Sequence, residues 1–318
     1  MNPVTRNNVM NEEKTEQVKK SLKKIKEFKD INGWKLEKIS IGATSEAKYK
    51  VSRQERSYFF KEIKSNEAEI LRILTQLGSE LIPKVIFPDM LKKNILVSDY
   101  IEPSPVKTKT IELGLIKKFL KMQNQLNDKG FLKENKNLRR YKFKEKDNGN
   151  LVKWIQRIVS IGNANLQLLK KYQLKILDDF IEITKELQEH SDEIARGYAQ
   201  MPFARQHHDF REENIIGIPQ KIVDWGSSYG HGPFLFDLAP FLLGDAERIK
   251  ILVENSDICK DRDDDQINGW LEIATCARFF AFLAYRLDGE NIEVSTRKSC
   301  NALLEYEILK YKGLEELF

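Results

Sequence analysis

The first thirty residues carry a helical pattern of hydrophobic positions. Residues 11–29 place four hydrophobic side chains on one stripe, with lysines around the remainder: Val18, Leu22, Ile25 and Phe28. This periodicity predicts an amphipathic helix. A basic helix of this kind can lie on a membrane or on RNA. We favour the simpler interpretation, in which the stripe packs on the following domain and the lysines are solvated.

From Trp34 the pattern changes to the alternation that is typical of β-strands. It predicts five strands, at residues 36–41, 47–51, 57–63, 84–87 and 94–98. A helix at residues 67–77 interrupts them, with Asn66 as its N-cap and Gly78 at its end. The order βββαββ predicts a small antiparallel-sheet domain that carries one helix.

The segment Pro103-Ser104-Pro105 marks a linker, and the chain beyond it reads as mostly helical. Helices are expected at residues 111–127, 151–169, 174–196, 245–254, 267–287 and 295–317. The lysine-rich residues 133–150 are expected to form a loop. Residues 270–285 are apolar nearly all round, which predicts the buried spine of a second domain.

With 41% hydrophobic and 32% charged residues, the composition is that of a globular protein. A chain of 318 residues is long enough to form two lobes, each with its own core. A net charge of +5 does not demand a nucleic-acid partner. The three cysteines are widely spaced, which favours reduced thiols. No signal-peptide core and no run of ~20 apolar residues is present. We therefore expect a cytoplasmic protein without a membrane or nucleic-acid partner.

One polar stretch, residues 204–216, stands out because it combines His-His-Asp with a later Asn. Asn214 begins one short strand and Asp224 ends the next, and the turn between them contains Pro219. Antiparallel pairing would bring Asn214 level, within about a residue, with Asp224 or Trp225. An amide oxygen and a carboxylate suit Mg²⁺, and Asp209 could orient a hydroxyl and accept its proton. These are the requirements of phosphoryl transfer.

The pattern His207-x-Asp209-x-x-x-x-Asn214, followed by Ile222-Val223-Asp224, resembles the catalytic signature of the aminoglycoside phosphotransferase and choline kinase group. This group is related to the protein kinases. The resemblance implies an α+β, two-lobed, protein-kinase-like fold. Its N-lobe would be a small antiparallel β-sheet with one helix, and its C-lobe would be larger and mainly helical. The implied divisions are an N-terminal helical extension (1–30), a nucleotide-binding N-lobe (31–100), and a C-lobe (101–318) with the catalytic loop and acceptor pocket.

The same resemblance implies roles for residues of the motif. Asp209 would be the catalytic base, with Asn214 and Asp224 as Mg²⁺ ligands. His207 would brace the loop. Asp237 would accept backbone hydrogen bonds from the loop, although capping of the following helix is an equal interpretation.

In the first domain the resemblance implies a site for ATP or GTP. Lys61 would grip the α- and β-phosphates and Glu67 would be its ion-pair partner, with Glu69 as the competitor. A phosphate loop with a single glycine and a hinge for the base complete the expected cofactor-binding set: Gly42, Thr44 and Ser45 in the loop, and Ser98 and Tyr100 at the hinge.

The implied function is transfer of the γ-phosphoryl group to a hydroxyl of a small molecule, for example an aminoglycoside, by a monomer or homodimer. Choline, homoserine, a sugar or a protein hydroxyl are alternative acceptors. The acceptor pocket would involve acidic residues, among which the candidates are Asp261, Asp263, Asp264, Asp265, Glu213, Asp245 and Glu247. A non-catalytic nucleotide-binding pseudokinase is a second alternative. A metal hydrolase built on His207, His208, Asp209 and His231 is a third.

Overall fold

The computed structural model describes residues 15–39, 48–102, 111–128, 189–210, 214–227, 231–242 and 244–286. The helices expected at 151–169 and 295–317 lie outside these ranges, and so do Gly42, Thr44, Ser45 and Glu213. The chain divides into two compact units. The first comprises Met1–Thr110 and Arg211–Ser228, and the second comprises Ile111–Phe210 and Tyr229–Phe318.

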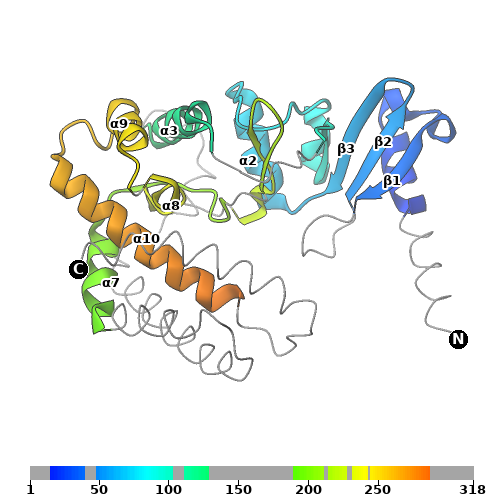
Figure 1. Cartoon of the computed structure of the whole chain (residues 1–318). Helices are drawn as coiled ribbons and strands as arrows, with labels where there is room; N and C mark the ends of the chain where they lie inside the picture. The colour runs from blue at the N-terminus through cyan, green and yellow to red at the C-terminus, as the bar shows by residue number, and fades with distance from the viewer. Residues whose placement is uncertain are drawn as a thin grey trace, which may run out of the picture. The chain divides into compact units, whose positions relative to one another are not determined.

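The first unit contains a four-stranded antiparallel sheet in the order β1-β2-β3-β4 (Figure 1). Its strands are β1 (Lys35–Ile39), β2 (Lys48–Arg53), β3 (Arg56–Glu62) and β4 (Ile95–Asp99). One helix, α2 (Ser65–Gln76), follows β3. It ends as expected, because Gly78 takes the left-handed conformation with φ of 61° and its N–H donates to Thr75.

The fourth predicted strand, at residues 84–87, is reduced to an isolated bridge between Val85 and Ser98. The backbone N–H of Ile86 still donates to Val97, at 2.9 Å. Proline stands at 83 and at 88, on both sides of the bridge. Because proline has no N–H and its fixed φ favours turns, the pairing does not extend beyond the bridge. Pro88 instead opens the 3₁₀ helix η3 (Pro88–Lys93).

Asn66 is not the N-cap of α2, contrary to the sequence-based expectation. The helix begins at Ser65 and its N-cap is Lys64, which makes no side-chain capping hydrogen bond. The Asn66 side chain has another partner, since its amide nitrogen donates to the carbonyl oxygen of Gly226 at 2.7 Å. The side chain therefore joins the start of α2 to the turn that follows Asp224.

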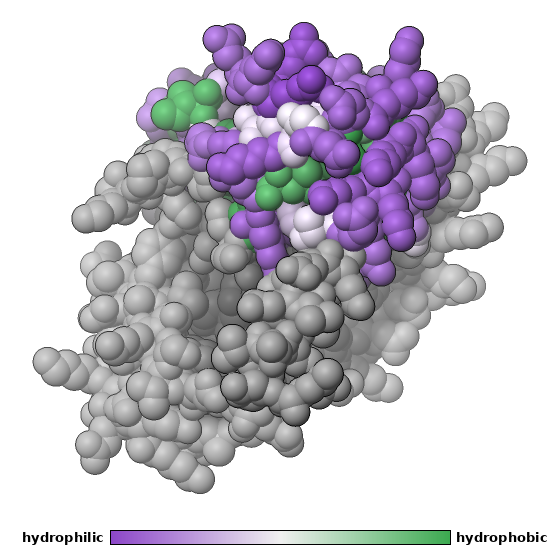
Figure 2. All heavy atoms as spheres, turned by 90° about the vertical axis from the view of Figure 1, so that its right-hand side faces the viewer, coloured by the Kyte–Doolittle hydropathy of each residue, from purple (hydrophilic) through white to green (hydrophobic). Residues whose placement is uncertain are grey.

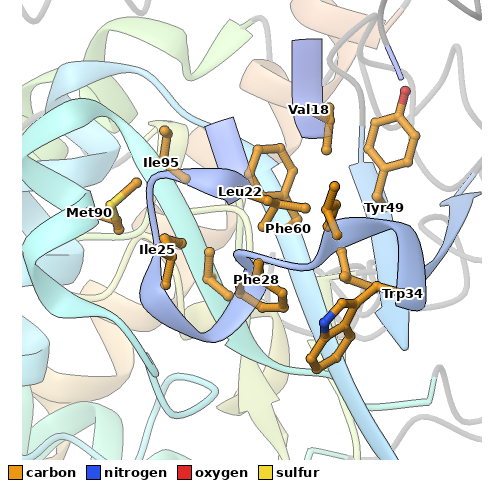
Figure 3. Close-up of a cluster of buried hydrophobic side chains, with 12 residues drawn as sticks. Val18, Leu22, Ile25, Phe28, Trp34, Tyr49, Phe60, Met90 and Ile95 are labelled. Atoms are coloured by element: carbon orange, nitrogen blue, oxygen red, sulfur yellow. The ribbon is translucent and has the colours of Figure 1, made fainter. Parts of the chain in front are cut away.

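The N-terminal segment packs on the sheet, as predicted. Residues 15–23 are helical, and the 3₁₀ turn η1 (Lys26–Phe28) replaces the last part of the expected helix. A second 3₁₀ turn, η2 (Ile31–Gly33), follows it. The hydrophobic stripe is buried in one cluster with side chains of the strands (Figure 3). The Phe28 ring lies at its centre, 4.8 Å from the Trp34 ring and 5.6 Å from the Tyr58 ring. The cluster consists of Val18, Leu22, Ile25, Phe28, Ile31, Trp34, Tyr49, Val51, Phe60, Met90, Ile95 and Val97.

The lysines of this segment remain at the surface. Lys23, Lys24 and Lys26 are exposed, whereas the neighbouring Leu22 and Ile25 are buried. In Figure 2 most of the coloured surface is hydrophilic, with smaller hydrophobic areas among the hydrophilic residues. The predicted packing of the hydrophobic stripe on the following domain is therefore confirmed, and the lysines lie where solvent reaches them.

The second unit is mainly helical among its described residues (Figure 1). Its helices are α3 (Leu113–Asn127), α7 (Ser191–Gln200), α8 (Ala239–Leu242), α9 (Ala246–Asn255) and α10 (Asp264–Arg286). Helix α3 packs against α9, and α10 packs against α7. Gly197 permits the second contact, because a Cβ there would lie 2.5 Å from the Ile273 side chain. Helix α7 continues to Gln200, past the expected end at Arg196.

Two short strands of the second unit, β5 (Phe203–Arg205) and β8 (His231–Pro233), pair antiparallel. The predicted spine is α10, in which each described side chain from Trp270 to Arg278 is buried or half-buried. None of the helices in the described ranges has the length and apolar character that a membrane span requires. The α+β fold class is confirmed, with a small antiparallel sheet carrying one helix in one unit and a mainly helical second unit.

Candidate functional site

The hairpin that carries Asn214 and Asp224 belongs to the first unit. Its strands β6 (Ile215–Ile216) and β7 (Lys221–Ile222) pair antiparallel. The N–H of Val223 donates to the carbonyl of Asn214 at 2.9 Å, so Asn214 lies opposite Val223 and one residue from Asp224. The predicted position of Asn214, level with Asp224 within about a residue, is confirmed, whereas a position level with Trp225 is not. The N–H of Ile222 also donates to Leu81, which fixes the hairpin to the rest of the unit.

Asp224 takes a left-handed backbone conformation, with φ of 62°. Few residues other than glycine adopt this region, and aspartate tolerates it better than most. Strand β7 ends at Ile222, and Asp224 leads into the turn that includes Trp225, whose indole N–H donates to the Ile222 carbonyl at 3.1 Å. The Asp224 carboxylate lies 3.0 Å from the Lys61 ammonium.

Lys61 and Glu67 form the ion pair that the sequence led us to expect. The Lys61 ammonium lies 2.9 Å and 3.1 Å from the two Glu67 carboxylate oxygens, and both residues are 3% exposed. Lys61 lies at the end of β3 and Glu67 in the first turn of α2, so the short connection between the two elements brings them together. Burial lowers the pKa of Lys61, but the Glu67 and Asp224 carboxylates outweigh it and hold the pKa above its ordinary value.

A second lysine, Lys48, also reaches this cluster. It lies opposite Lys61 in the register of β2 and β3, and its ammonium is 3.9 Å from the second Asp224 carboxylate oxygen. The alternating pattern of residues 47–51 predicted a strand and did not single out Lys48. The strand register was the available signal, because a hairpin closed at the polar residues 53–56 places position 48 opposite position 61.

Asp237 organises the loop around Asp209 in the second unit. Its carboxylate is fully buried and accepts hydrogen bonds from the backbone N–H groups of His207, at 2.5 Å, and His208, at 3.0 Å. The support role that the resemblance implied for Asp237 is thus visible in its contacts. The Gln206 side-chain oxygen in turn accepts from the Asp237 N–H, at 3.3 Å.

The imidazole of His207 fixes the backbone next to Asp209. It is fully buried, and its Nδ1 accepts a hydrogen bond from the Asp209 N–H at 3.3 Å. His208 adopts a positive φ of 66°, so the chain turns sharply between the two histidines. The described residues contain no cluster of three or more His, Cys, Asp or Glu side chains that would hold a metal ion.

Arg278 is a loop-supporting residue that sequence analysis missed. It projects from α10 and donates to the Asp237 carboxylate at 3.3 Å, to the Phe236 carbonyl at 3.1 Å and to the Phe210 carbonyl. It therefore contacts both the buried carboxylate and the residue after Asp209. The sequence offered one sign of this role. Arg278 is the only charged residue between Glu272 and Arg286, and a charged side chain in a mostly apolar helix usually has a buried partner.

The two expected hinge residues lie at the end of β4 in the first unit. Ser98 is 2% exposed, and Tyr100 follows the strand. The Tyr100 hydroxyl lies 3.3 Å from the Glu102 carboxylate, and the Lys50 ammonium lies 4.3 Å from the ring centroid. Burial, followed by the Glu102 charge, raises the pKa of Tyr100 above its ordinary value.

Two of the candidate acidic residues of the second unit, Asp245 and Asp263, accept hydrogen bonds at helix starts. Asp245 caps α9, because its carboxylate accepts from the Arg248 N–H at 3.1 Å. Asp263 accepts from the Gln266 N–H at 2.8 Å, at the start of α10. The whole run of residues 261–265 is exposed, as is Glu247. The run is therefore an exposed loop in which Asp263 caps the start of α10.

Comparison with known proteins finds a likeness in structure only. A scan against protein-family models and a search of curated protein sequences both find no match. A choline/ethanolamine kinase family protein from Mesorhizobium loti aligns with 93% of this chain and 94% of its own, at 15% identity and a TM-score of 0.51. A mutant aminoglycoside 2′-phosphotransferase-IIIa in its GDP complex aligns over 93% and 98%, at 14% identity and a TM-score of 0.52. The resemblance drawn from the motif is thus confirmed at the level of fold, and this chain has the protein-kinase-like fold of these two structures.

Proposed function

We propose that this protein is a phosphotransferase that moves the γ-phosphoryl group of ATP or GTP, with Mg²⁺, to a hydroxyl of a small molecule. The observation that carries the proposal is the contact of the buried Lys61 ammonium with both Glu67 and Asp224. A lysine held in this way presents a fixed positive charge next to a carboxylate that can take a metal. That combination suits a nucleotide phosphate group.

In this proposal the N-lobe, residues 31–100, binds the nucleotide. Lys61 contacts the α- and β-phosphates while Glu67 holds the ammonium in place. Gly42, Thr44 and Ser45 contribute backbone N–H groups and hydroxyls to the phosphates, and Ser98 and Tyr100 border the base. The N–H groups of Asp99 and Tyr100 already donate to Lys84 and Ser57. The backbone donor for the base therefore lies beyond Tyr100.

Asn214 and Asp224 would hold the metal. They supply an amide oxygen and a carboxylate from the same end of one hairpin, and these are the hard oxygen donors that Mg²⁺ takes. The Asp224 side chain is 30% exposed, so it remains accessible to an ion from solvent. Bound Mg²⁺ would neutralise charge on the phosphates during transfer.

Asp209 would act in the C-lobe, residues 101–318, as the catalytic base. Its carboxylate would orient the acceptor hydroxyl and take its proton as the oxygen bonds to the γ-phosphorus and the bond to the nucleoside diphosphate breaks. The hydrogen bonds of His207 and Asp237 support this role, because they fix the backbone on which Asp209 is carried. The protein would work in the cytoplasm.

The support for the acceptor class comes from the likeness in fold, since no residue contact described above identifies an acceptor. The two compared structures are described as a choline/ethanolamine kinase family protein and an aminoglycoside phosphotransferase. We therefore propose a small hydroxyl compound, first of all an aminoglycoside-type one, with choline, homoserine or a sugar as the alternatives. A thermal-shift screen of these compounds with Mg²⁺-nucleotide would identify the acceptor, because a bound ligand raises stability by mass action.

The alternative of a non-catalytic nucleotide-binding protein is tested by turnover. We expect the wild-type protein to consume ATP or GTP with Mg²⁺ and one acceptor of the panel. Asp209→Asn should lose at least about 100-fold in rate, as expected for loss of a general base. Asp192→Asn, an exposed carboxylate on α7, is the matched control and should keep full rate. Equal turnover by Asp209→Asn and wild type would overturn the catalytic assignment.

A further inference from the structure

The Asn66 side chain reaches from α2 to the turn that contains Gly226. Its amide nitrogen lies 2.7 Å from the Gly226 carbonyl oxygen and donates a hydrogen bond to it. Gly226 belongs to the 3₁₀ turn η8 (Trp225–Ser227), which packs on α2 within the first unit. A carbonyl oxygen only accepts hydrogen bonds, so the contact needs a donor at position 66.

Helix α2 itself does not account for an asparagine at this position. Asn66 is the second residue of the helix, whereas the N-cap is Lys64. Inside a helix asparagine is less favourable than alanine, and it stabilises helices mainly as a cap. Since Asn66 does not cap α2, we infer that its side chain contributes through the contact with Gly226.

The Gly226 carbonyl lies two residues beyond Asp224 along the chain. A Cβ at Gly226 would lie 3.7 Å from an Asp224 carboxylate oxygen, so the turn lies beside that carboxylate. The indole N–H of Trp225 donates to the Ile222 carbonyl at 3.1 Å, which holds the turn to its own hairpin. Asn66 holds the same turn to α2. The backbone after Asp224 is thus fixed by one contact within the hairpin and one from the helix.

Asp224 needs such support, because its backbone lies in the left-handed region, with φ of 62°. A residue other than glycine keeps this conformation only where its surroundings hold it there. Mg²⁺ in turn demands near-ideal octahedral geometry from its ligands. A carboxylate that is in place for only part of the time lowers the apparent affinity for the ion by the same fraction. Loss of the Asn66 contact should therefore weaken metal binding through the turn.

We propose that Asn66 is a positioning residue for the metal site, whose hydrogen bond to the Gly226 carbonyl holds the turn that places the Asp224 carboxylate for the Mg²⁺ of a bound nucleotide. The inference rests on the proposed function, because it needs Asp224 to bind the metal. It links the first turn of α2 to the metal, whereas Glu67 in the same turn contacts Lys61.

The test is isothermal titration of non-hydrolysable ATP and GTP analogues into wild type and variants, once with Mg²⁺ and once with EDTA. In Asn66→Ala the strengthening of binding by Mg²⁺ should be about fivefold smaller than in wild type, the value of one neutral hydrogen bond. Binding in EDTA should be unchanged, because it does not depend on a metal ligand. Gln76→Ala is the matched control and should keep the full strengthening. Gln76 is also an amide on α2, but its hydrogen bond with Arg72, at 3.2 Å, is exposed.

Each outcome bears on a separate statement. If Asn66→Ala keeps the wild-type strengthening, the role of Asn66 is overturned and the proposed function stands. If Asn66→Ala loses affinity equally in Mg²⁺ and in EDTA, the damage is general and the role is overturned as well. If Mg²⁺ does not strengthen binding to the wild type, the metal site itself is rejected. If Asn66→Ala does not fold, Asn66→Leu provides the same comparison, because leucine has nearly the shape of asparagine and no side-chain N–H.

Discussion

Lys61 and Glu67 form a buried ion pair in which the ammonium nitrogen lies 2.9 Å from one carboxylate oxygen and 3.1 Å from the other. Removing one member of such a pair leaves a buried charge and costs about 3–5 kcal/mol. Lys61→Met should reduce the free energy of unfolding more than Glu67→Gln, because Lys61 retains Asp224 in the second variant. Urea unfolding of both single variants and of the double variant measures these free energies. If the loss in the double variant equals the sum of the two single losses, Lys61 and Glu67 are not coupled and the ion pair is contradicted.

The contribution of Lys61 to stability should depend on pH in a defined direction. Its pKa is raised in the folded protein, so the contribution is fully present below the ordinary value of 10.5 and is lost as the pH rises through the higher folded-state value. The difference in unfolding free energy between wild type and Lys61→Met should be constant from pH 7 to about pH 9 and decline only in strong alkali. A decline near neutral pH would show that Lys61 is not held by its carboxylates.

The buried ion pair of Asp237 and Arg278 should contribute more to the free energy of unfolding than a similar ion pair at the surface. Asp237→Asn removes the charge that faces Arg278 and two backbone N–H groups, so it should cost about 3 kcal/mol. Asp245→Asn is the matched control, since Asp245 also pairs with an arginine, at 3.0 Å, but is 41% exposed. It should cost about 1 kcal/mol or less. Equal costs by thermal unfolding would contradict the supporting role of Asp237.

Cys259 should be chemically inert in the folded protein. It is fully buried, and burial raises the pKa of its thiol from 9.0 to about 11, although Ser256 and Arg262 act in the opposite direction. At pH 8 the thiolate would be on the order of one molecule in a thousand. Iodoacetamide should therefore modify the Cys259 peptide far more slowly in native protein than in urea, as followed by mass spectrometry. Equally rapid modification in both states would show that the site opens readily.

The sequence predicted those parts of the structure that local pattern and short-range pairing determine. Alternating hydrophobic positions located the strands of the sheet, and the turn at Pro219 placed Asn214 one residue from Asp224. The ion pair of Lys61 with Glu67 was expected from a motif whose two members lie six positions apart. These features depend on a few neighbouring residues, which a linear pattern can represent.

The missed features depend on contacts between distant parts of the chain. Asn66 looked like a helix cap, but its amide bonds to Gly226, 160 positions away. Arg278 supports the loop at Phe210 from a helix 68 positions later. Lys48 required the strand register as well as the strand pattern. In each case a polar side chain has a partner that only the tertiary structure brings within reach.

We propose above all that Asp224 holds the Mg²⁺ of a bound nucleotide. Titration of non-hydrolysable ATP and GTP analogues into wild type and Asp224→Asn, each with Mg²⁺ and with EDTA, tests it most directly. Asparagine is the suitable replacement, because it tolerates the left-handed backbone at this position. We predict that Mg²⁺ strengthens binding to the wild type at least about tenfold and has little effect on Asp224→Asn. Wild-type binding that is indifferent to Mg²⁺, or the same strengthening in Asp224→Asn, would contradict the claim.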